Sequence, residues 1–256
     1  MFFKAEGLAK RFGGRVVLQD VGIEVAEGEI HGIMGPNGAG KTTFFHVLTG
    51  QHKPDGGRVT FRGEDITGLA PREVARRGIA RSFQLMNLFD DETALVNALI
   101  ATPEMRARGF DMASDAARLD AGRARAQRVL DDVGLGAKAG ARAKSLSYGE
   151  RRALEIGVAL ASDPKLLFLD EPTAGLGAEG TERIAALIAS LRKKVTMVVI
   201  EHDMRFLFGL ADRIAVVHWG QVIARGTPAE LRANEWVRRS NLGKFSILPP
   251  LNGDPK

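Results

Sequence analysis

Residues 35–42 read GPNGAGKT, and this short stretch decides how the flanking sequence folds. It matches the pattern G-x-x-x-x-G-K-[ST], follows the apolar run IHGIM (30–34) and precedes residues 41–49, which favour a helix. Glycines let successive backbone N–H groups converge on one anion, and a helix N-terminus adds positive potential. The stretch therefore predicts a phosphate-binding loop. Lys41 is expected to reach the β- and γ-phosphates of a nucleotide, and the Thr42 hydroxyl to bind Mg²⁺.

Two acidic residues are candidates for magnesium binding and for catalysis. They are Asp170 and Glu171, which directly follow the apolar strand LLFL (166–169). A carboxylate at the carboxyl end of a parallel strand faces the ligand crevice of an α/β sheet. We expect Asp170 to hold the Mg²⁺ shell and Glu171 to polarise an attacking water as general base. Two acids after a strand are by themselves more often the start of a loop. The phosphate loop in the same chain favours the functional interpretation.

Residues 145–156 read SLSYGERRALEI and predict the start of a helix. Ser147 is a suitable N-cap and Glu150 follows three residues later, which is the pattern of a capping box. Gly149 lies in the first turn, where helix propensity disfavours glycine. The amide end of this helix is therefore bare, which suggests that an anion lies against it.

The order of predicted elements indicates an α/β protein with an insertion. Residues 1–29 favour short antiparallel strands, and further strands are expected at 30–34, 58–61, 79–83, 166–169, 195–200, 214–217 and 221–224. Between 85 and 145 strand signals vanish and helical spacing dominates, most clearly at 115–133. We therefore predict a single domain: an α/β core with an antiparallel β-subdomain (1–84 and 162–243), a helical subdomain (85–161) and a loosely ordered, proline-containing tail (244–256).

Composition narrows the class of protein. The 256 residues are 45% hydrophobic and 26% charged, so disordered and fibrous classes are excluded. The absence of cysteine excludes a disulfide framework and a cysteine metal site. The first residues lack the apolar run of a signal peptide, and no segment approaches the ~20 apolar residues of a membrane span. We expect a chain that is soluble when isolated, or that docks on a membrane through another protein.

The net charge of +5 permits nucleic acid or anionic lipid as a partner. The arginines are scattered, however, and few aromatic residues lie among them to stack on bases. A solvated basic surface is the favoured interpretation, and nucleic acid is not expected as a partner.

Five motifs together resemble the ATP-binding subunit of an ABC transporter, in that family's order. They are the Walker A loop GPNGAGKTT (35–43), the Q-loop glutamine Gln84 in RSFQLMNLF, the signature LSYGE (146–150), the Walker B segment LLFLDEP (166–172) and the switch histidine His202 in VIEHDM. The resemblance implies the P-loop NTPase fold of ABC ATPases and an ATPase that uses Mg²⁺.

The resemblance also implies a role for each matching position. The expected ATP-binding residues are Phe12, Val17, Gly35, Asn37, Gly38, Ala39, Gly40, Lys41, Thr42 and Thr43; the catalytic residues are Glu171, His202 and Gln84; Thr42, Gln84 and Asp170 serve the metal. Two positions keep a simpler alternative. Phe12, expected to stack on adenine, could be a core residue, and His202 could be a strand-end or capping histidine.

In this family two cassettes close head to tail. The resemblance implies that Ser147, Gly149 and Glu150 face the ATP held by a second cassette, so this chain pairs with itself or with a close relative. Departures occur at Tyr148 and Glu150, where the usual signature has Gly and Gln, and at Gly177, where the family usually has Asp. Looser communication between the two sites is one expected consequence.

Local stretches such as KRFGG (10–14), GIARSFQ (78–84), IEHDM (200–204) and GTPAELRAN (226–234) resemble one branch of the family. That branch imports branched-chain amino acids and related amides or urea, and this chain resembles the first of its two ATPases. The implied partners are a second ATPase, transmembrane permeases and, indirectly, a periplasmic or extracellular binding protein. The implied location is the cytoplasmic face of the cell membrane.

Three alternatives remain open at this point. The lipopolysaccharide-export ATPase shares much of the pattern. A soluble ABC ATPase acting on ribosomes or DNA usually has two cassettes or a long coiled-coil insertion, and neither is visible. A GTPase or kinase does not explain LSYGE, and the base-reading N-K-x-D sequence of G proteins is absent.

Overall fold

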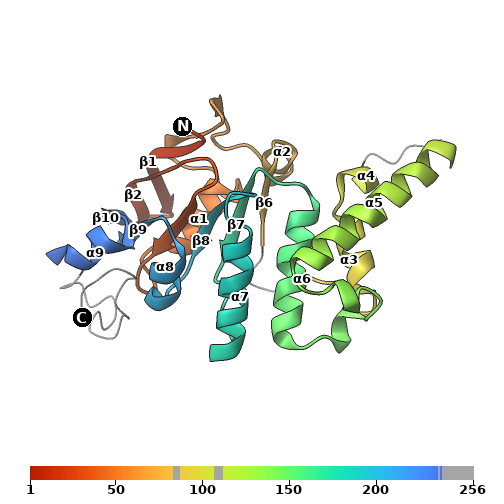
Figure 1. The fold of residues 1–256 in the computed structure, drawn as a ribbon. Helices are drawn as coiled ribbons and strands as arrows, with labels where there is room; N and C mark the ends of the chain where they lie inside the picture. Colours follow the sequence, from red (N-terminus) through yellow and green to blue (C-terminus); the bar gives the residue numbers. More distant parts are fainter. Residues whose placement is uncertain (83–86, 107–111, 236, 238–256) are drawn as a thin grey trace. The chain divides into compact units, whose positions relative to one another are not determined.

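The computed structural model describes residues 1–82, 87–106, 112–235 and 237, and the chain divides into two compact units (Figure 1). Unit 1 comprises residues 1–77 together with the chain from residue 191 onward, and unit 2 comprises residues 78–190. The boundaries of these compact units fall at 77/78 and 190/191. The subdomain bounds expected from the sequence, at 84/85 and 161/162, stay a prediction. Unit 2 contains the expected helical segment and, in addition, two strands and a further helix.

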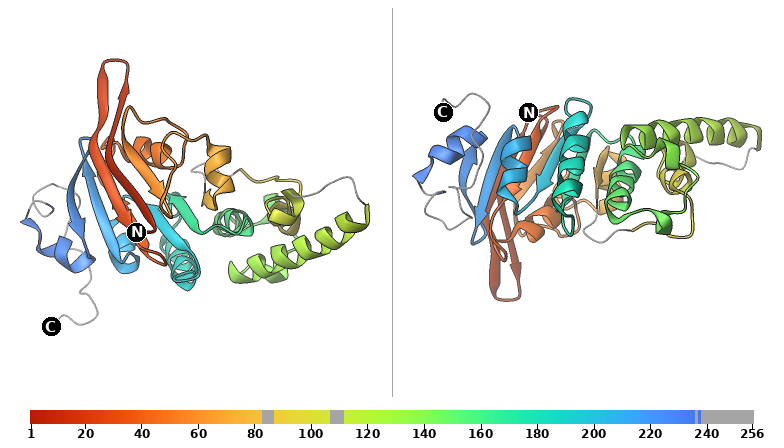
Figure 2. Two further views of the ribbon diagram at one scale, coloured as in Figure 1. Left: turned by 90° about the horizontal axis from the view of Figure 1, so that it is seen from above. Right: turned by 60° about the horizontal axis from the view of Figure 1, so that its bottom comes forward.

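Unit 1 begins with a four-stranded antiparallel sheet, as the alternation in residues 1–29 predicts. Its strands are β1 (Phe3–Phe12), β2 (Arg15–Val25), β4 (Gly56–Phe61) and β5 (Glu64–Asp65), in the order β2-β1-β4-β5. Phe3 pairs with Val25 and Phe12 with Arg15, so β1 and β2 form one long hairpin. The hairpin, coloured red, extends beyond the other strands of its unit in both views of Figure 2.

Unit 1 also contains the strand that leads into the phosphate loop. This strand, β3 (Ile30–Met34), lies between β8 (Thr196–Ile200) and β9 (Arg213–His218) and is parallel to both; β10 (Gln221–Gly226) is antiparallel to β9. Every residue of β3 and β8 is buried. Such uniformly buried strands are expected where both faces of a parallel sheet are covered. The helices of this unit are α1 (Lys41–Leu48), α2 (Pro71–Arg76), α8 (Met204–Leu210) and α9 (Pro228–Ala233).

Unit 2 combines a parallel strand pair with the helical lobe. The strands are β6 (Ile79–Arg81) and β7 (Leu166–Asp170), and the helices are α3 (Ala94–Ile100), α4 (Pro103–Arg106), α5 (Met112–Asp132), α6 (Tyr148–Ala161) and α7 (Ala178–Ser190). Helices α3, α5 and α6 pack against one another. The inserted helical subdomain predicted from the sequence is thus present, with α5 beginning three residues earlier than expected.

Some expectations fall outside the described residues: the end of the strand expected at 79–83, part of the segment after residue 85, and the tail at 244–256. Within the described ranges, β6 ends at Arg81. No helix in the described part of the chain is long and apolar enough to cross a membrane.

Candidate nucleotide-binding site

The phosphate loop is residues 35–40, between β3 and α1. Gly38 and Gly40 have φ angles of 77° and 99°, in the left-handed region that glycine adopts without strain. A Cβ atom added at Gly35 would lie 2.1 Å from the Val217 carbonyl oxygen, so only glycine fits there. The loop is therefore held close against the end of β9, and its backbone shape depends on the glycines that the motif specifies.

Helix α1 leaves its N-terminal amides open. Its N-cap is Gly40, which provides no side-chain hydrogen bond. By contrast, Ser147, Asp203 and Thr227 each cap the following helix with a side-chain oxygen. Because glycine at the N-cap has no side-chain acceptor, the N-terminus of α1 is suited to bind an anion. Thr42, in this first turn, is exposed.

The Lys41 side chain lies within the loop. The residue is only 6% exposed, and its ammonium group donates hydrogen bonds to the carbonyl oxygens of Gly35, at 2.7 Å, and Pro36, at 3.0 Å. These bonds hold the positive charge against the loop backbone. A phosphate bound by the loop amides would therefore meet this charge without a large movement of the side chain.

His202 follows β8 at the same edge of unit 1. The backbone N–H of Glu201 donates to the Ile33 carbonyl oxygen at 3.1 Å, which holds the chain beside the carboxyl end of β3. The imidazole of His202 is exposed. The N-cap of helix α8 is Asp203, not His202. The Asp203 carboxylate accepts hydrogen bonds from the backbone N–H groups of Arg205 and Phe206. His202 thus lies at the strand end with its ring exposed, and its Nδ1 lies 3.7 Å from the buried Glu201 carboxylate.

The expected adenine face lies on the β1–β2 hairpin. Phe12 is 45% exposed, so the alternative that it is a core residue is wrong. Its ring packs edge-on against His52, with centroids 5.3 Å apart. A Cβ atom at Gly40 would lie 3.0 Å from the Val17 carbonyl oxygen, which places Val17 next to the phosphate loop.

In unit 2, Asp170 ends a wholly buried strand and is itself only 7% exposed. Its backbone N–H donates to the Ser82 hydroxyl at 3.3 Å, and the Ser82 N–H donates to the Phe168 carbonyl oxygen at 2.8 Å. Burial lowers the pKa of the neighbouring Arg81 guanidinium, and the charge of Asp170 offsets part of this effect. Sequence reasoning missed Arg81 and Ser82, because their closeness to Asp170 depends on the pairing of β6 with β7.

Glu171 has a left-handed backbone conformation, with a φ angle of 45°. This conformation costs a residue with a side chain roughly 1–2 kcal/mol, and such strain is concentrated at functional sites. The Ala174 N–H donates to the Glu171 carbonyl oxygen at 3.0 Å, closing a turn directly after the strand. The strained position is the one that the sequence assigns to the general base.

The start of α6 contains the capping box that the sequence predicts. The Glu150 N–H donates to the Ser147 hydroxyl at 3.3 Å, and the Ser147 N–H donates to the Glu150 carboxylate at 3.0 Å. Lys138 donates to the other Glu150 oxygen at 2.5 Å. The hydrogen bond from Lys138 and then the backbone of Ser147 lower the pKa of Glu150.

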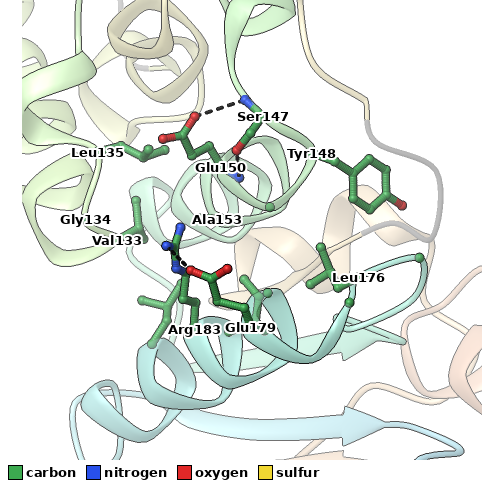
Figure 3. Close-up of a pocket in the computed structure, with 16 residues that line it drawn as sticks. Val133, Gly134, Leu135, Ser147, Tyr148, Glu150, Ala153, Leu176, Glu179 and Arg183 are labelled. Atoms are coloured by element: carbon green, nitrogen blue, oxygen red, sulfur yellow. Dashed lines mark hydrogen bonds and ion pairs between the residues drawn. The ribbon is translucent and has the colours of Figure 1, made fainter.

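A cavity of about 560 Å³ lies beside this helix start, within unit 2 (Figure 3). The first turn of α6, residues 175–177 and α7 surround it, and Leu135, Ala153, Leu176, Ile184 and Leu187 form its apolar wall. At Gly149 an added Cβ atom would have no contact closer than 3.8 Å, to Leu176. The backbone of the signature glycine therefore borders open space.

The expected site residues are thus distributed over both units. Unit 1 contains Phe12, Val17, the whole of 35–43 and His202; unit 2 contains Ser147, Gly149, Glu150, Asp170 and Glu171. Gln84 lies outside the described residues. Sequence reasoning also missed Glu201, a fully buried carboxylate after β8, although an acid directly following the run VTMVVI is a visible signal.

These features define a nucleotide-binding P-loop protein, and comparison with known proteins specifies the family. The sequence profile of the ABC transporter family matches residues 18–174. The chain therefore belongs to the ABC transporter family, and the relatives described next are ATP-binding subunits of such transporters.

The curated relatives include the high-affinity branched-chain amino acid transport ATP-binding protein LivG of Salmonella typhimurium, which is 41% identical in an alignment of 245 residues that covers 93% of this chain and 96% of LivG. BraF of Pseudomonas aeruginosa, with the same description, is 38% identical over 94% of this chain and 97% of its own length. The lipopolysaccharide export ATP-binding protein LptB of Acidithiobacillus ferridurans is 34% identical over 95% of this chain and 98% of LptB. The resemblance to the importer branch is confirmed, and the export alternative is not favoured.

Solved structures give the same fold. The ADP conformation of MJ1267, an ATP-binding cassette of an ABC transporter, has a TM-score of 0.82 and 30% identity, and the match covers 95% of this chain and 99% of that one. A dimeric post-hydrolysis state of the cassette MJ0796 bound to ADP and Pi has a TM-score of 0.72 and 27% identity, covering 89% and 99%. The predicted ABC ATPase fold is therefore confirmed.

Proposed function

We propose that this chain is the ATP-hydrolysing subunit of an ABC importer for branched-chain amino acids or related small polar solutes. The observation that carries the proposal is the 41% identity to LivG over nearly the full length of both chains. The open, glycine-shaped phosphate loop supports ATP as the ligand, since its backbone and Lys41 are arranged for phosphate.

The nucleotide is held mainly by unit 1 in this proposal. The loop amides, the open end of α1 and the Lys41 ammonium bind the phosphates, and Asn37, Ala39 and Thr43 belong to the same loop and helix start. The exposed ring of Phe12 stacks on the adenine, with Val17 beside it. An exposed aromatic ring on the hairpin whose Val17 carbonyl borders the phosphate loop favours a nucleotide over a free phosphate.

Magnesium fits the oxygen donors that these motifs provide. Thr42, Gln84 and Asp170 would hold the ion, and when bound it neutralises phosphate charge. Mg²⁺ usually takes one or two protein ligands together with phosphate oxygens and water. This agrees with the described residues, which contain no group of three or more His, Cys, Asp or Glu able to hold a metal.

Hydrolysis is assigned to groups that orient and polarise a water. Glu171, as general base, accepts a proton from the attacking water, whose oxygen bonds to the γ-phosphorus as the bond to the ADP leaving group breaks. Gln84 helps to position that water, and His202 donates a hydrogen bond to the γ-phosphate. The left-handed backbone at Glu171 supports its role, because strained backbone conformations are concentrated at functional sites. Most of the catalysis is positioning and electrostatic stabilisation.

The signature is assigned to the ATP of a second cassette. Ser147 already accepts a hydrogen bond from Glu150, yet a hydroxyl has one donor as well as two acceptor positions. Its proton can therefore go to a phosphate oxygen while the capping box persists. The backbone of Gly149 borders open space, which allows the same approach.

Two cassettes of this kind, identical or closely related, act on transmembrane permeases at the cytoplasmic face of the membrane. A solute-binding protein outside the membrane delivers the solute to the permeases. Closure of the two cassettes around ATP drives the permeases between access states, and hydrolysis reopens them.

Co-purification tests this proposal. The tagged Glu171→Gln chain, which we expect to retain ATP, is isolated from gently solubilised native membranes in the presence of ATP, and its partners are identified by mass spectrometry. Polytopic permeases are the expected partners. A second ATPase chain in the eluate would indicate a heterodimer.

The matched control is Glu182→Gln, the same change on the exposed face of α7, which should not trap the complex. Solute class is then measured as uptake of labelled leucine, compared with urea, by vesicles reconstituted with the recovered complex. Recovery of ribosomal proteins or DNA-repair factors without any permease would overturn the transporter assignment.

A further inference from the structure

Unit 1 contains a second cavity, at the opposite end of β3 from the phosphate loop. Its volume is about 290 Å³, many times the ~30 Å³ that one water occupies in the liquid. It is lined by Met1, Glu24, Ala26, Glu29, His31, Arg213, Ile214 and Arg225. His31 is the second residue of β3, and Gly35 follows the last, so about 13 Å of extended strand separates this cavity from the phosphate loop.

His31 is the most buried polar residue of this cavity, with only 3% of its surface exposed. Its Nδ1 atom lies 2.8 Å from one Glu29 carboxylate oxygen, and the other oxygen accepts the Ala26 N–H at 2.7 Å. Burial raises the pKa of Glu29, but the hydrogen bonds from His31 and Ala26 outweigh it, and the net pKa is lowered. Glu29 is therefore an ionised carboxylate, which can only accept hydrogen bonds. The proton in the hydrogen bond between His31 and Glu29 is thus on Nδ1 of His31.

The other ring nitrogen of His31 is left without a partner. Nε2 is buried and makes no hydrogen bond to any described residue. An unsatisfied buried polar atom destabilises the folded state, so its presence needs an explanation. The cavity that His31 lines provides room for a group that would satisfy it.

The charges around the cavity indicate what kind of group fits. Glu29 is engaged by His31, and Glu24 lies 3.5 Å from the ammonium group of Lys4. Neither Arg213 nor Arg225 makes a side-chain hydrogen bond or ion pair to a described residue. The charge of Arg213 acts on the carboxylates of Glu29 and Glu230 without a hydrogen bond to either. Two guanidinium groups therefore line the cavity with hydrogen-bond donors to spare, and guanidinium is suited to bind oxyanions.

A metal ion fits less well. A histidine whose other nitrogen is held by a carboxylate is a common arrangement of a metal ligand. The described residues, however, contain no group of three or more His, Cys, Asp or Glu that could complete such a site. The two arginines would in addition repel a cation.

We infer that this cavity binds a small oxyanion, a phosphate, sulfate or carboxylate group, through Nε2–H of a protonated His31 and the guanidinium groups of Arg213 and Arg225. The inference does not depend on the proposed function. Because Nδ1 already donates to Glu29, Nε2 becomes a donor only when the ring takes up a second proton. Anion binding is thus coupled to proton uptake.

The affinity should accordingly fall as pH rises. The charged groups that line the cavity with His31 are the carboxylates of Glu24 and Glu29 and the opposing positive charges of Arg213 and Arg225. A bound anion cancels the opposing charges, so the proton enters with the anion. This balance makes the site sensitive to both pH and anion concentration.

Sulfate is the first probe, because its own charge does not change in the neutral range. Imidazole signals of the histidine-labelled chain are followed by NMR during a sulfate titration, and the His31 signal among the five histidines is assigned with His31→Gln. The phosphate loop can also bind sulfate, so the titration is repeated with Lys41→Ala. Saturable movement of the His31 signal toward the protonated form is expected in both chains.

Two arginine variants test the geometry. Arg213→Gln and Arg225→Gln should each weaken sulfate binding by about tenfold, the usual loss for one hydrogen bond to a charged group. Arg72→Gln, a matched change at an exposed position of the same unit, should leave binding unchanged. Inorganic phosphate and acetate in separate titrations show which oxyanion binds best.

The inference is overturned if none of the three anions moves the His31 signal in the folded chain. Full affinity in the double variant Arg213→Gln/Arg225→Gln would overturn it equally. A failure of either kind leaves ATP binding by the wild-type chain intact and is therefore distinguishable from a failure of the proposed function.

Discussion

The Tyr148 hydroxyl, in the first turn of α6, donates a hydrogen bond to the Ala174 carbonyl oxygen at 3.1 Å. Ala174 closes the turn that begins at Glu171. At the next residue, Gly175, the φ angle is 76°, which favours glycine, and an added Cβ atom would lie 2.9 Å from the same hydroxyl, so a side chain there would displace the tyrosine. A side chain that departs from the usual signature thus ties the signature helix to the segment of the proposed base.

Tyr148→Phe removes this tie and keeps the ring. Because the bond is exposed, we expect the free energy of unfolding to fall by less than about 1 kcal/mol. ATP affinity should be unchanged, while kcat should fall several-fold because the turn after Glu171 is held less firmly. Steady-state kinetics and chemical denaturation measure the two effects. An unchanged kcat would show that the bond has only a structural role.

Lys41→Ala should lower ATP affinity by one to two orders of magnitude. The ammonium group would make charged hydrogen bonds to phosphate oxygens, each contributing about 1.5–3 kcal/mol. Titration calorimetry with ATP and Mg²⁺ measures the loss. Lys53→Ala, at an exposed position of unit 1, serves as control and should bind ATP normally. Equal affinities of the two variants would refute the assignment of Lys41.

Glu171→Gln should retain ATP binding and reduce turnover by about 10²–10⁴-fold, the usual effect of removing a general base. The variant should then accumulate as an ATP-bound dimer, visible by size-exclusion chromatography with light scattering. Glu182→Gln is the matched control and should turn over normally. Turnover by Glu171→Gln at the wild-type rate would remove Glu171 from the mechanism.

The backbone at Glu171 provides a separate prediction about stability. Glycine adopts the left-handed conformation without strain, whereas alanine does not. Glu171→Gly should therefore unfold with a free energy about 1 kcal/mol higher than that of Glu171→Ala, with both variants catalytically impaired. Urea denaturation of the two variants gives the difference. If alanine is as stable as glycine here, the residue is not strained in solution.

Glu150 should make stability depend on pH at the acid end. Lys138 and the Ser147 backbone lower the pKa of Glu150 in the folded state. A lowered folded pKa stabilises the protein above the unfolded value, ~4.3, and this contribution is lost as pH falls through the folded value. Glu150→Gln keeps a residue able to complete the capping box but removes the charge.

The wild-type chain should therefore have a higher free energy of unfolding than Glu150→Gln near neutral pH. This difference in stability should vanish in acid. Thermal denaturation at a series of pH values measures it. High salt should reduce the advantage near neutral pH, because the ion pair with Lys138 is largely exposed. If the difference in stability persists unchanged in acid, its cause is not the charge of Glu150.

The sequence was sufficient to predict those features that depend only on residues close together in the chain. The capping box at Ser147 and Glu150 needs only a spacing of three residues, and the structure contains both hydrogen bonds. The strand before the phosphate loop and the helix after it follow from an apolar run, glycines and helix formers. The motif order also specified the family, because each motif is short and contiguous.

Contacts between distant segments could not be read from the sequence. The hydrogen bond of Asp170 to Ser82, 88 residues apart, depends on the parallel pairing of β6 with β7. The cavity around His31 is formed by β3, β9, β10 and the end of β2, which no local pattern brings together.

The sequence by itself thus determined the elements, the phosphate loop and the family, since these depend on residue type and short-range spacing. Only the tertiary structure decided that Phe12 is exposed, that Tyr148 bonds to Ala174 and that His31 is buried beside two arginines. The physical reason is that burial and long-range hydrogen bonding depend on which strands and helices pack together, and this is a property of the whole chain.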